Sequence, residues 1–234
     1  MYRHLSWAAS AYRERSHERR ADLFVRLMRP RAGDRMLDLG GGDGSFAARI
    51  ARRVSVRVTV ADVADTRFEA RDRYGFSEVA LKIAASGSAS LPFDDGEFDL
   101  VLCNSVIEHV TLPRPECRVP GIRERDWRER AAAAQRSFAD EIRRVGGGYF
   151  VQTPHRSFPI DVHTWLPLTN FLPHDAARRL VLVLDGIWVK KCGVADWRLL
   201  ATVEMRRLFP DAAIHIERLA YLPKSIIAYR RRRA

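Results

Sequence analysis

Glycines packed into one short stretch are the feature of the sequence with the clearest chemical meaning. The stretch follows the apolar run Met36–Leu39 and precedes a helical pattern that begins at Ser45. Glycine adopts positive φ and lets the backbone approach a ligand closely, at an entropic cost that a plain connection does not need. A strand, a glycine-rich turn and a helix N-terminus together form a site for a nucleotide-like ligand. The glycines are Gly40, Gly41, Gly42 and Gly44.

Two carboxylates flank this stretch. Asp38 lies just before the glycines, where it can accept backbone N–H bonds and organise the turn. Asp62 ends the valine-rich run that follows, about twenty residues after the loop, where a dinucleotide fingerprint places its ribose-binding acid. The spacing Gly42-x-Gly44-x-x-Ala47 fits that fingerprint, so a dinucleotide is one candidate ligand.

Imidazoles supply the second set of reactive groups. His155 and His163 flank Asp161 in one Pro-rich stretch, and either histidine is a candidate general base. The alternative is that both hold the stretch in place through hydrogen bonds to the backbone. Cys103, Cys117 and Cys192 are far apart and form no Cys/His ligand pattern, so neither a disulfide framework nor a metal site is expected.

The elements that must position these groups alternate between strands and helices, which predicts parallel βαβ units in a doubly wound sheet. Asn104 follows the fourth expected strand, at the edge where such sheets bind ligands, although it is equally suited to cap the next helix. The expected strands are 35–39, 54–61, 79–84, 98–103, 149–153, 212–219 and 225–229. The expected helices are 1–30, 45–53, 65–74, 123–145 and 199–209.

Residues 154–196 depart from this alternation. Prolines, aromatics and apolar clusters replace regular periodicity there, and the segment is too apolar for a disordered linker. We expect a folded lid or acceptor-binding insertion within a single domain of residues 1–234.

The complete register of the first motif, Asp38-x-Gly40-x-Gly42-x-Gly44, resembles motif I of the class I S-adenosylmethionine (SAM)-dependent methyltransferases. Val58 to Asp62 is similar to the second strand of that family. Leu91-Pro92-Phe93 and the run from Phe98 to Val110 resemble the methyltransferase-11-type subgroup, and a dinucleotide site does not explain them. The resemblance implies a Rossmann-like, mostly parallel seven-stranded sheet with a C-terminal antiparallel hairpin, and SAM as the cofactor.

The resemblance also implies roles for single residues. The loop glycines would lie against the methionine part and the ribose of SAM, and Asp62 would accept the ribose hydroxyls. Asp38 would contact the methionine ammonium. Relatives commonly carry an acidic residue for the adenine amino group where this chain has Gly87, so Ser88 or backbone carbonyls are the candidates for that contact.

The same resemblance extends to the acceptor side. Gln152 to Pro167 is similar to a TPNRxFPIExH-type stretch of bacterial members, with His155 replacing Asn and Asp161 replacing Glu. A base is needed only where the acceptor must lose a proton. His109, in the Glu108-His109 pair, is expected to be structural. The implied activity is methylation of a small molecule with an apolar portion, at an O, N or C atom that the sequence leaves open.

The sequence leaves two further functions open, one suggested by its charge and one by Gly87. The net charge of +11 and the tail Arg230–Arg233 suggest an RNA methyltransferase, and Gly87 suggests a non-catalytic SAM-binding scaffold. No basic cluster is interleaved with aromatics, so nucleic acid is not expected as a partner, and arginines that decorate helices account for the charge. The sequence shows no secretory leader, and its longest apolar run, Leu180 to Val189, is too short to cross a bilayer. We expect a cytoplasmic protein, and the oligomeric state stays open.

Overall fold

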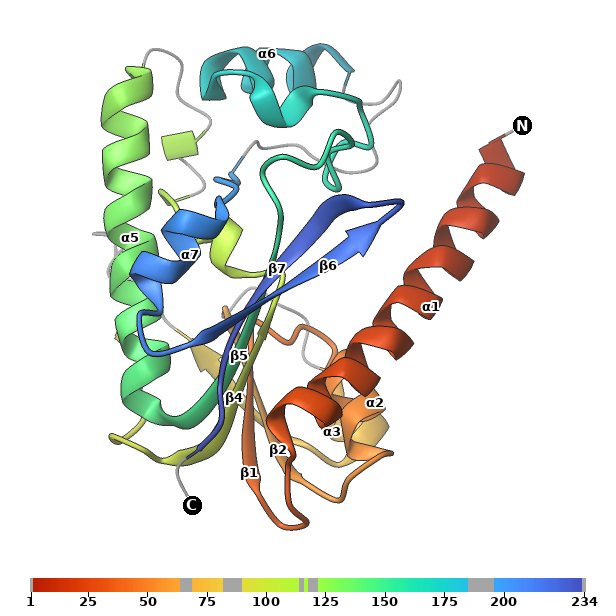
Figure 1. The fold of residues 1–234 in the computed structure, drawn as a ribbon, viewed down its shortest axis with the longest axis vertical. Coiled ribbons are helices and arrows are strands. Elements are labelled where there is room, and N and C mark those ends of the chain that lie inside the picture. Colours follow the sequence, from red (N-terminus) through yellow and green to blue (C-terminus); the bar gives the residue numbers. More distant parts are fainter. Residues whose placement is uncertain are drawn as a thin grey trace.

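A seven-stranded sheet forms the centre of the computed structural model, with strand order β3-β2-β1-β4-β5-β7-β6 (Figure 1). The structure describes residues 2–63, 69–81, 90–113, 116–117, 122–184 and 196–232. Strands β1 to β5 pair in parallel, and β7 is antiparallel to both β5 and β6. The strands are β1 Arg35–Leu39, β2 Arg57–Val63, β3 Ser77–Leu81, β4 Phe98–Asn104, β5 Gly146–Pro154, β6 Ala213–Leu219 and β7 Leu222–Arg230. The mostly parallel sheet and its closing antiparallel hairpin are therefore confirmed.

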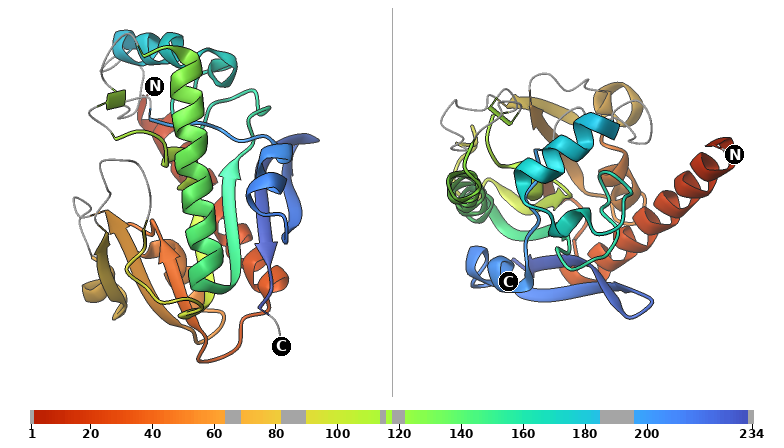
Figure 2. Two further views of the ribbon diagram at one scale, coloured as in Figure 1. Left: turned by 90° about the vertical axis from the view of Figure 1, so that its left-hand side faces the viewer. Right: turned by 90° about the horizontal axis from the view of Figure 1, so that it is seen from above.

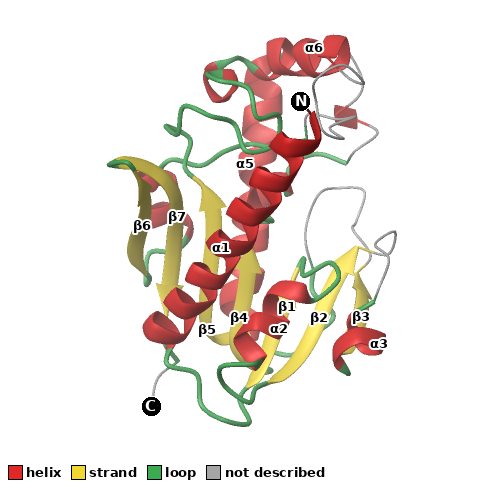
Figure 3. Ribbon diagram, turned by 90° about the vertical axis from the view of Figure 1, so that its right-hand side faces the viewer, coloured by secondary structure: helices red, strands yellow, loops and turns green. Residues whose placement is uncertain are grey.

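Helices cover both faces of this sheet (Figures 2 and 3). Helices α1 and α2 lie on one face and α5 and α7 on the other. The helices are α1 Tyr2–Met28, α2 Ser45–Ala51, α3 Ala70–Tyr74, α5 Glu124–Val145, α6 His174–Leu184 and α7 Thr202–Leu208, with the 3-10 turns η1 Ile107–His109 and η2 Thr169–Phe171. No helix among the described residues is long and apolar enough to cross a membrane.

Successive side chains of the central strands point to opposite faces of the sheet, so the core consists of two clusters. On β1, Met36 packs with the α1 and α2 side chains, and Leu37 and Leu39 pack with those of α5 and α7. A strand buried on both faces reads as a nearly continuous apolar run, which is why β1 and β4 were recognisable in the sequence. Asp38 has the same parity as Met36, so its side chain points toward the α1 and α2 face.

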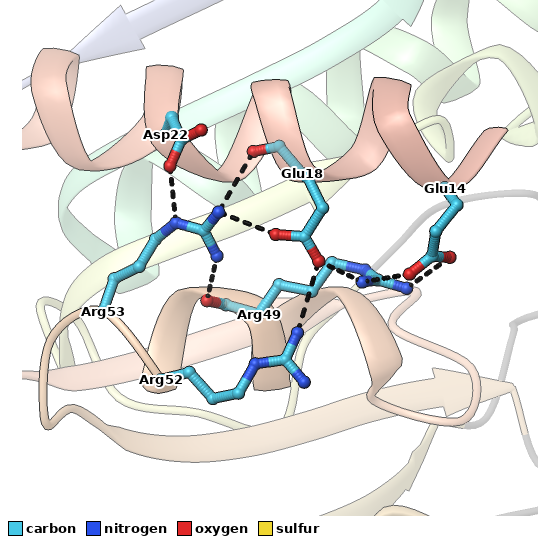
Figure 4. A network of polar contacts seen from close by, with 6 residues as sticks. All are labelled: Glu14, Glu18, Asp22, Arg49, Arg52 and Arg53. Atoms are coloured by element: carbon cyan, nitrogen blue, oxygen red, sulfur yellow. Dashed lines mark hydrogen bonds and ion pairs between the residues drawn. The ribbon is translucent and has the colours of Figure 1, made fainter. Parts of the chain in front are cut away.

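Charged side chains join α1 to α2 (Figure 4). Arg53 binds Asp22 at 2.7 Å through Nε and Glu18 at 2.7 Å through Nη2. Arg49 and Arg52 also pair with Glu18. Part of the arginine excess is therefore neutralised by acidic residues within the fold.

Several element boundaries differ from those expected from the sequence. Gly146, Gly147 and Gly148 lie inside β5 instead of leading into it. A Cβ on Gly148 would lie 2.7 Å from the backbone nitrogen of Arg232, so the C-terminal chain passes too close for a side chain. The second strand begins at Arg57 instead of Val54, and the third covers 77–81.

Residues 155–184 lie beyond the carboxyl ends of the parallel strands, with α6 at the top of Figure 1. An isolated bridge joins Ile160 to Pro167, and η2 and α6 follow. The segment thus contains regular structure that its irregular sequence pattern did not indicate. The expected lid or acceptor-binding insertion over 154–196 stays a prediction, and its residues 185–195 lie outside the described residues.

Candidate functional site

The glycine turn between β1 and α2 needs glycine for two separate reasons. Gly40, Gly42 and Gly44 have φ values of 75°, 56° and 72°, in the left-handed region that favours glycine. Gly41 does not, but a Cβ there would lie 2.4 Å from Asp38 Oδ2. The turn is therefore shaped around the Asp38 carboxylate as well as by its own dihedral angles.

Asp38 is the most unusual carboxylate of this region. It is 2% exposed, and its Oδ2 has no hydrogen-bond partner among the described residues. Burial, and then the nearby Asp62 and Asp43 carboxylates, raise the pKa of Asp38 to about 7. An unpaired buried carboxylate oxygen is costly, and a cationic group beside it would offset that cost.

Asp62 lies beside the same turn. Its Oδ2 accepts the Gly42 N–H at 2.8 Å, and its Oδ1 accepts the Val63 N–H at 2.7 Å. The sequence-predicted set of Asp38, the loop glycines and Asp62 is thus brought together at the carboxyl ends of β1 and β2. A Cβ on Gly42 would meet no atom within 4 Å, so the space over the turn is open.

Asn104, at the end of β4, belongs to a different group of side chains. Its Oδ1 accepts a hydrogen bond from Arg20 Nη1 at 3.1 Å, and the same nitrogen donates to Gln152 Oε1 at 3.1 Å. Arg20 also forms an ion pair of 2.7 Å with Glu217. The residue before η1 is Val106, so Asn104 is not its cap. Ser88 and Gly87 lie outside the described residues, so the adenine contact stays a prediction.

Both ring nitrogens of His155 are used within the protein. Nδ1 accepts the Ser157 N–H at 3.0 Å, and Nε2 lies 3.2 Å from Thr202 Oγ1. Burial, and then Arg218, lower the pKa of His155. These contacts match the alternative interpretation, in which the imidazole holds its segment against α7.

His163 lies in a cluster of titratable groups. Its Nδ1 is 2.9 Å from Asp161 Oδ1, and its ring stacks on Trp197 with centroids 4.5 Å apart. The His109 ring meets it edge-on at 4.9 Å, and His109 Nδ1 is 2.9 Å from Asp196 Oδ1. Burial opposes ionisation of Asp161, but hydrogen bonds from His163 and Thr164 hold its pKa below the usual value.

A cavity opens beside this cluster. The ring of Trp127, near the start of α5, stacks on His174 with centroids 3.9 Å apart. Within the described residues, Trp127 Nε1 and Asn170 Oδ1 are buried and have no hydrogen-bond partner. Trp197 lines the same cavity and also stacks on His163, so the cavity adjoins the histidine cluster. The lining includes Trp127, Arg156, Asn170, His174, Trp197 and Arg198.

The sequence did not single out Arg20, Trp127 or Trp197 as residues of the site. It also did not predict that Glu108 belongs to the histidine cluster. Arg20 lies among many other arginines of α1, so nothing in its local sequence distinguishes it. The Glu108-His109 pair and the Asp161-x-His163 spacing were visible, but they are far apart in sequence, and only the fold shows that they meet.

Comparison with known proteins finds a family model that matches the part of the chain containing the glycine turn. Residues 37–118 match the family model described as a methyltransferase domain. The 27-O-demethylrifamycin SV methyltransferase of Amycolatopsis mediterranei is 32% identical over 104 residues, 43% of this chain and 38% of that protein. The demethylmenaquinone methyltransferase of Clavibacter sepedonicus is 32% identical over 90 residues, 38% and 36% of the two chains. The chain thus spans less than two fifths of the length of these relatives.

Solved structures share the fold over most of the chain. A Pyrococcus horikoshii OT3 protein has a TM-score of 0.56 at 15% identity, and covers 95% of this chain and 91% of its own. A SAM dependent methyltransferase from Aquifex aeolicus has a TM-score of 0.50 at 13% identity, with coverage of 89% and 87%. At these identities the likeness is one of fold.

Proposed function

We propose that this chain transfers a methyl group from SAM to a small-molecule acceptor, because residues 37–118 match the family model described as a methyltransferase domain. The observation that carries this proposal is the buried Oδ2 of Asp38 beside the glycine turn, for which the described residues offer no hydrogen-bond partner. A carboxylate in that position is suited to a cationic ligand group, and the methionine part of SAM carries an ammonium.

The residues around the turn fit SAM. Asp38 would bind the ammonium, and Asp62 would accept the ribose hydroxyls in addition to the Gly42 N–H that it already accepts. Gly42, over which the structure is open, would let the backbone lie against the ligand. Bound SAM supplies an electrophilic methyl group on a sulfonium. The protein's contribution is to hold the acceptor in line with it, and such positioning supplies much of the rate.

The cavity at Trp127 and His174 is our candidate acceptor site. Its aromatic lining suits an acceptor with an apolar portion, and Trp127 Nε1 and Asn170 Oδ1 could fix polar groups of that molecule. The two relatives described above are named for small-molecule acceptors, which supports this class of substrate.

Of the two histidines predicted as bases, we assign acceptor chemistry to His163. It is paired with Asp161, as an oriented imidazole needs to be, and its stacking partner Trp197 lines the cavity. His155 is better described as a positioning residue, because both of its nitrogens contact its own supporting structure.

Calorimetric titration with SAM and S-adenosylhomocysteine tests the cofactor assignment. We expect wild-type protein to bind both, and Asp62→Ala to bind about tenfold to a hundredfold more weakly, because it loses charge-assisted hydrogen bonds. Asp72→Ala, which removes an exposed carboxylate on α3, is the matched control and should bind as the wild type does. Absence of SAM binding by the wild type would refute the proposal, and binding without turnover on a broad acceptor panel would favour a scaffold.

A further inference from the structure

Three side chains that could bind a metal ion meet where η1 approaches the 161–163 turn. One ligand atom from each of Glu108, His109 and His163 lies within 4.8 Å of the other two. Glu108 and His109 come from η1, directly after β4, and His163 comes from the segment that covers the sheet edge. The cofactor contacts proposed above use none of these three residues.

Glu108 is buried without full compensation. It is 0% exposed, and its Oε2 accepts a hydrogen bond from Thr153 Oγ1 at 3.0 Å. Its Oε1 is also buried, and the described part of the chain offers it no hydrogen-bond partner. A carboxylate oxygen left unpaired in the interior carries a large desolvation penalty, which a coordinated cation would offset.

Both imidazoles are oriented in the way that metal-binding histidines usually are. His109 Nδ1 lies 2.9 Å from Asp196 Oδ1, and His163 Nδ1 lies 2.9 Å from Asp161 Oδ1. A carboxylate accepts only, so each Nδ1 carries the proton and each Nε2 carries the lone pair that can bind a metal. Such carboxylate partners fix the tautomer and the ring orientation of histidine ligands.

Further contacts make these orientations rigid. Asp161 is 0% exposed, and its Oδ2 accepts hydrogen bonds from Thr164 N–H at 3.0 Å and Thr164 Oγ1 at 2.6 Å. Gln135 of α5 donates to the backbone carbonyls of Ile107 at 2.9 Å and Arg198 at 3.0 Å, which ties η1 to the chain that carries Asp196 and Trp197. The cluster is therefore supported from three separate parts of the fold.

We propose that Glu108, His109 and His163 bind one divalent transition-metal ion of the Zn²⁺ type. Two imidazole nitrogens and one carboxylate are a ligand set that suits Zn²⁺, and three protein ligands leave a coordination position for water or for an acceptor oxygen. In a tetrahedral site with bonds of about 2.1 Å, ligand atoms lie about 3.4 Å apart, so closure needs side-chain movements of roughly 1 Å. In this proposal His163 is a metal ligand and not a general base.

Zinc titration of the tag-free, full-length protein after chelator treatment tests the site directly, without SAM or acceptor. With a chromogenic chelator as competitor, we expect one equivalent of Zn²⁺ to bind at micromolar or lower concentration. Co²⁺ should give the visible absorption bands of a four- or five-coordinate N/O site. His109→Gln is the first variant, because the partly exposed His109 side chain can be replaced with little loss of packing. It should weaken binding by about tenfold or more, as should His163→Gln.

A matched control and a second readout keep the test decisive. His215→Gln, on β6 and outside the cluster, should bind Zn²⁺ as the wild type does, and circular dichroism should show that all variants are folded. The proposal is wrong if the wild type binds no stoichiometric Zn²⁺, or if folded His109→Gln and His163→Gln bind it unchanged. SAM calorimetry on the same metal-free and metal-loaded samples separates this outcome from failure of the cofactor assignment, since the glycine turn contains none of the three ligands.

Discussion

Asp38 and Asp62 lie at the same sheet edge but in different electrostatic environments. Asp62 accepts two backbone N–H bonds, whereas Asp38 is enclosed beneath the glycine turn with one oxygen unpaired among the described residues. The sequence predicted both residues, because fixed spacing around a glycine turn is a local property. It could not predict the meeting of Glu108 with His163, because that contact depends on how distant segments pack.

The raised pKa of Asp38 gives a prediction for stability. Its value of about 7 in the folded protein exceeds the reference value of 3.8, so the folded state binds the proton more tightly. Its stabilising contribution is complete below pH 3.8 and is lost as pH rises through 7, by at most about 4 kcal/mol. Asp38→Asn stays neutral, so in urea unfolding it should gain stability relative to the wild type between pH 4 and pH 7.

The same substitution should have the opposite effect on cofactor binding. A SAM ammonium pairs with the ionised carboxylate, so wild-type affinity should rise as pH increases from 5.5 to 7, and Asp38→Asn should bind weakly with a flatter profile. Calorimetry at each pH measures this. A pH-independent difference in stability between the two proteins would show that Asp38 titrates near its ordinary pKa.

Local sequence patterns identified the strands and helices but not the tertiary contacts between them. The sequence placed β1 at its observed bounds and α5 within one residue of them, because apolar periodicity and capping signals are local. It placed the three glycines of β5 just before the strand, because the close passage of the C-terminal chain over Gly148 is a tertiary constraint. For the same reason the sequence did not single out Arg20, which links α1 to the sheet through an ion pair and hydrogen bonds.

Replacing Arg20 should therefore weaken the attachment of α1 to the sheet edge. The Arg20 side chain is 6% exposed, and its loss leaves Glu217, Asn104 and Gln152 without their shared donor. We expect Arg20→Met to cost about 3 kcal/mol or more in urea unfolding, because breaking one partner of a buried ion pair strands the other. Arg20→Lys should recover only part of this, since an ammonium does not reproduce the guanidinium fork.

The exposed neighbour Arg19 provides the control. Arg19→Met should change stability by less than about 0.5 kcal/mol. A double variant, Arg20→Met with Glu217→Leu, should lose less stability than the two single variants added together, because it removes both charges of the pair and leaves neither without its partner. Strict additivity would show that the two side chains are not coupled.

For the whole molecule, the question is whether the net charge of +11 indicates a nucleic-acid partner. The fold uses many of its arginines internally, including three in the network between α1 and α2. The described part of the basic tail also contacts the fold. Arg231 Nε donates to the Leu27 carbonyl at 2.6 Å, and Arg232 Nη1 contacts Asp99 at 2.8 Å and Asp34 at 3.0 Å. These contacts account for part of the positive charge within the fold itself.

The substitution Arg232→Gln distinguishes a structural role of the tail from a role in RNA binding. If Arg232 serves the fold, the substitution should lower the free energy of unfolding by about 1 kcal/mol, because two carboxylates lose a partly buried partner. It should leave RNA affinity, measured by fluorescence anisotropy at several salt concentrations, no weaker than in Arg206→Gln, which removes an exposed charge on α7. A tail that bound RNA would behave in the opposite way. Arg232→Gln would then reduce the salt slope by about one counterion while leaving stability unchanged, because a phosphate contact contributes nothing to the free protein.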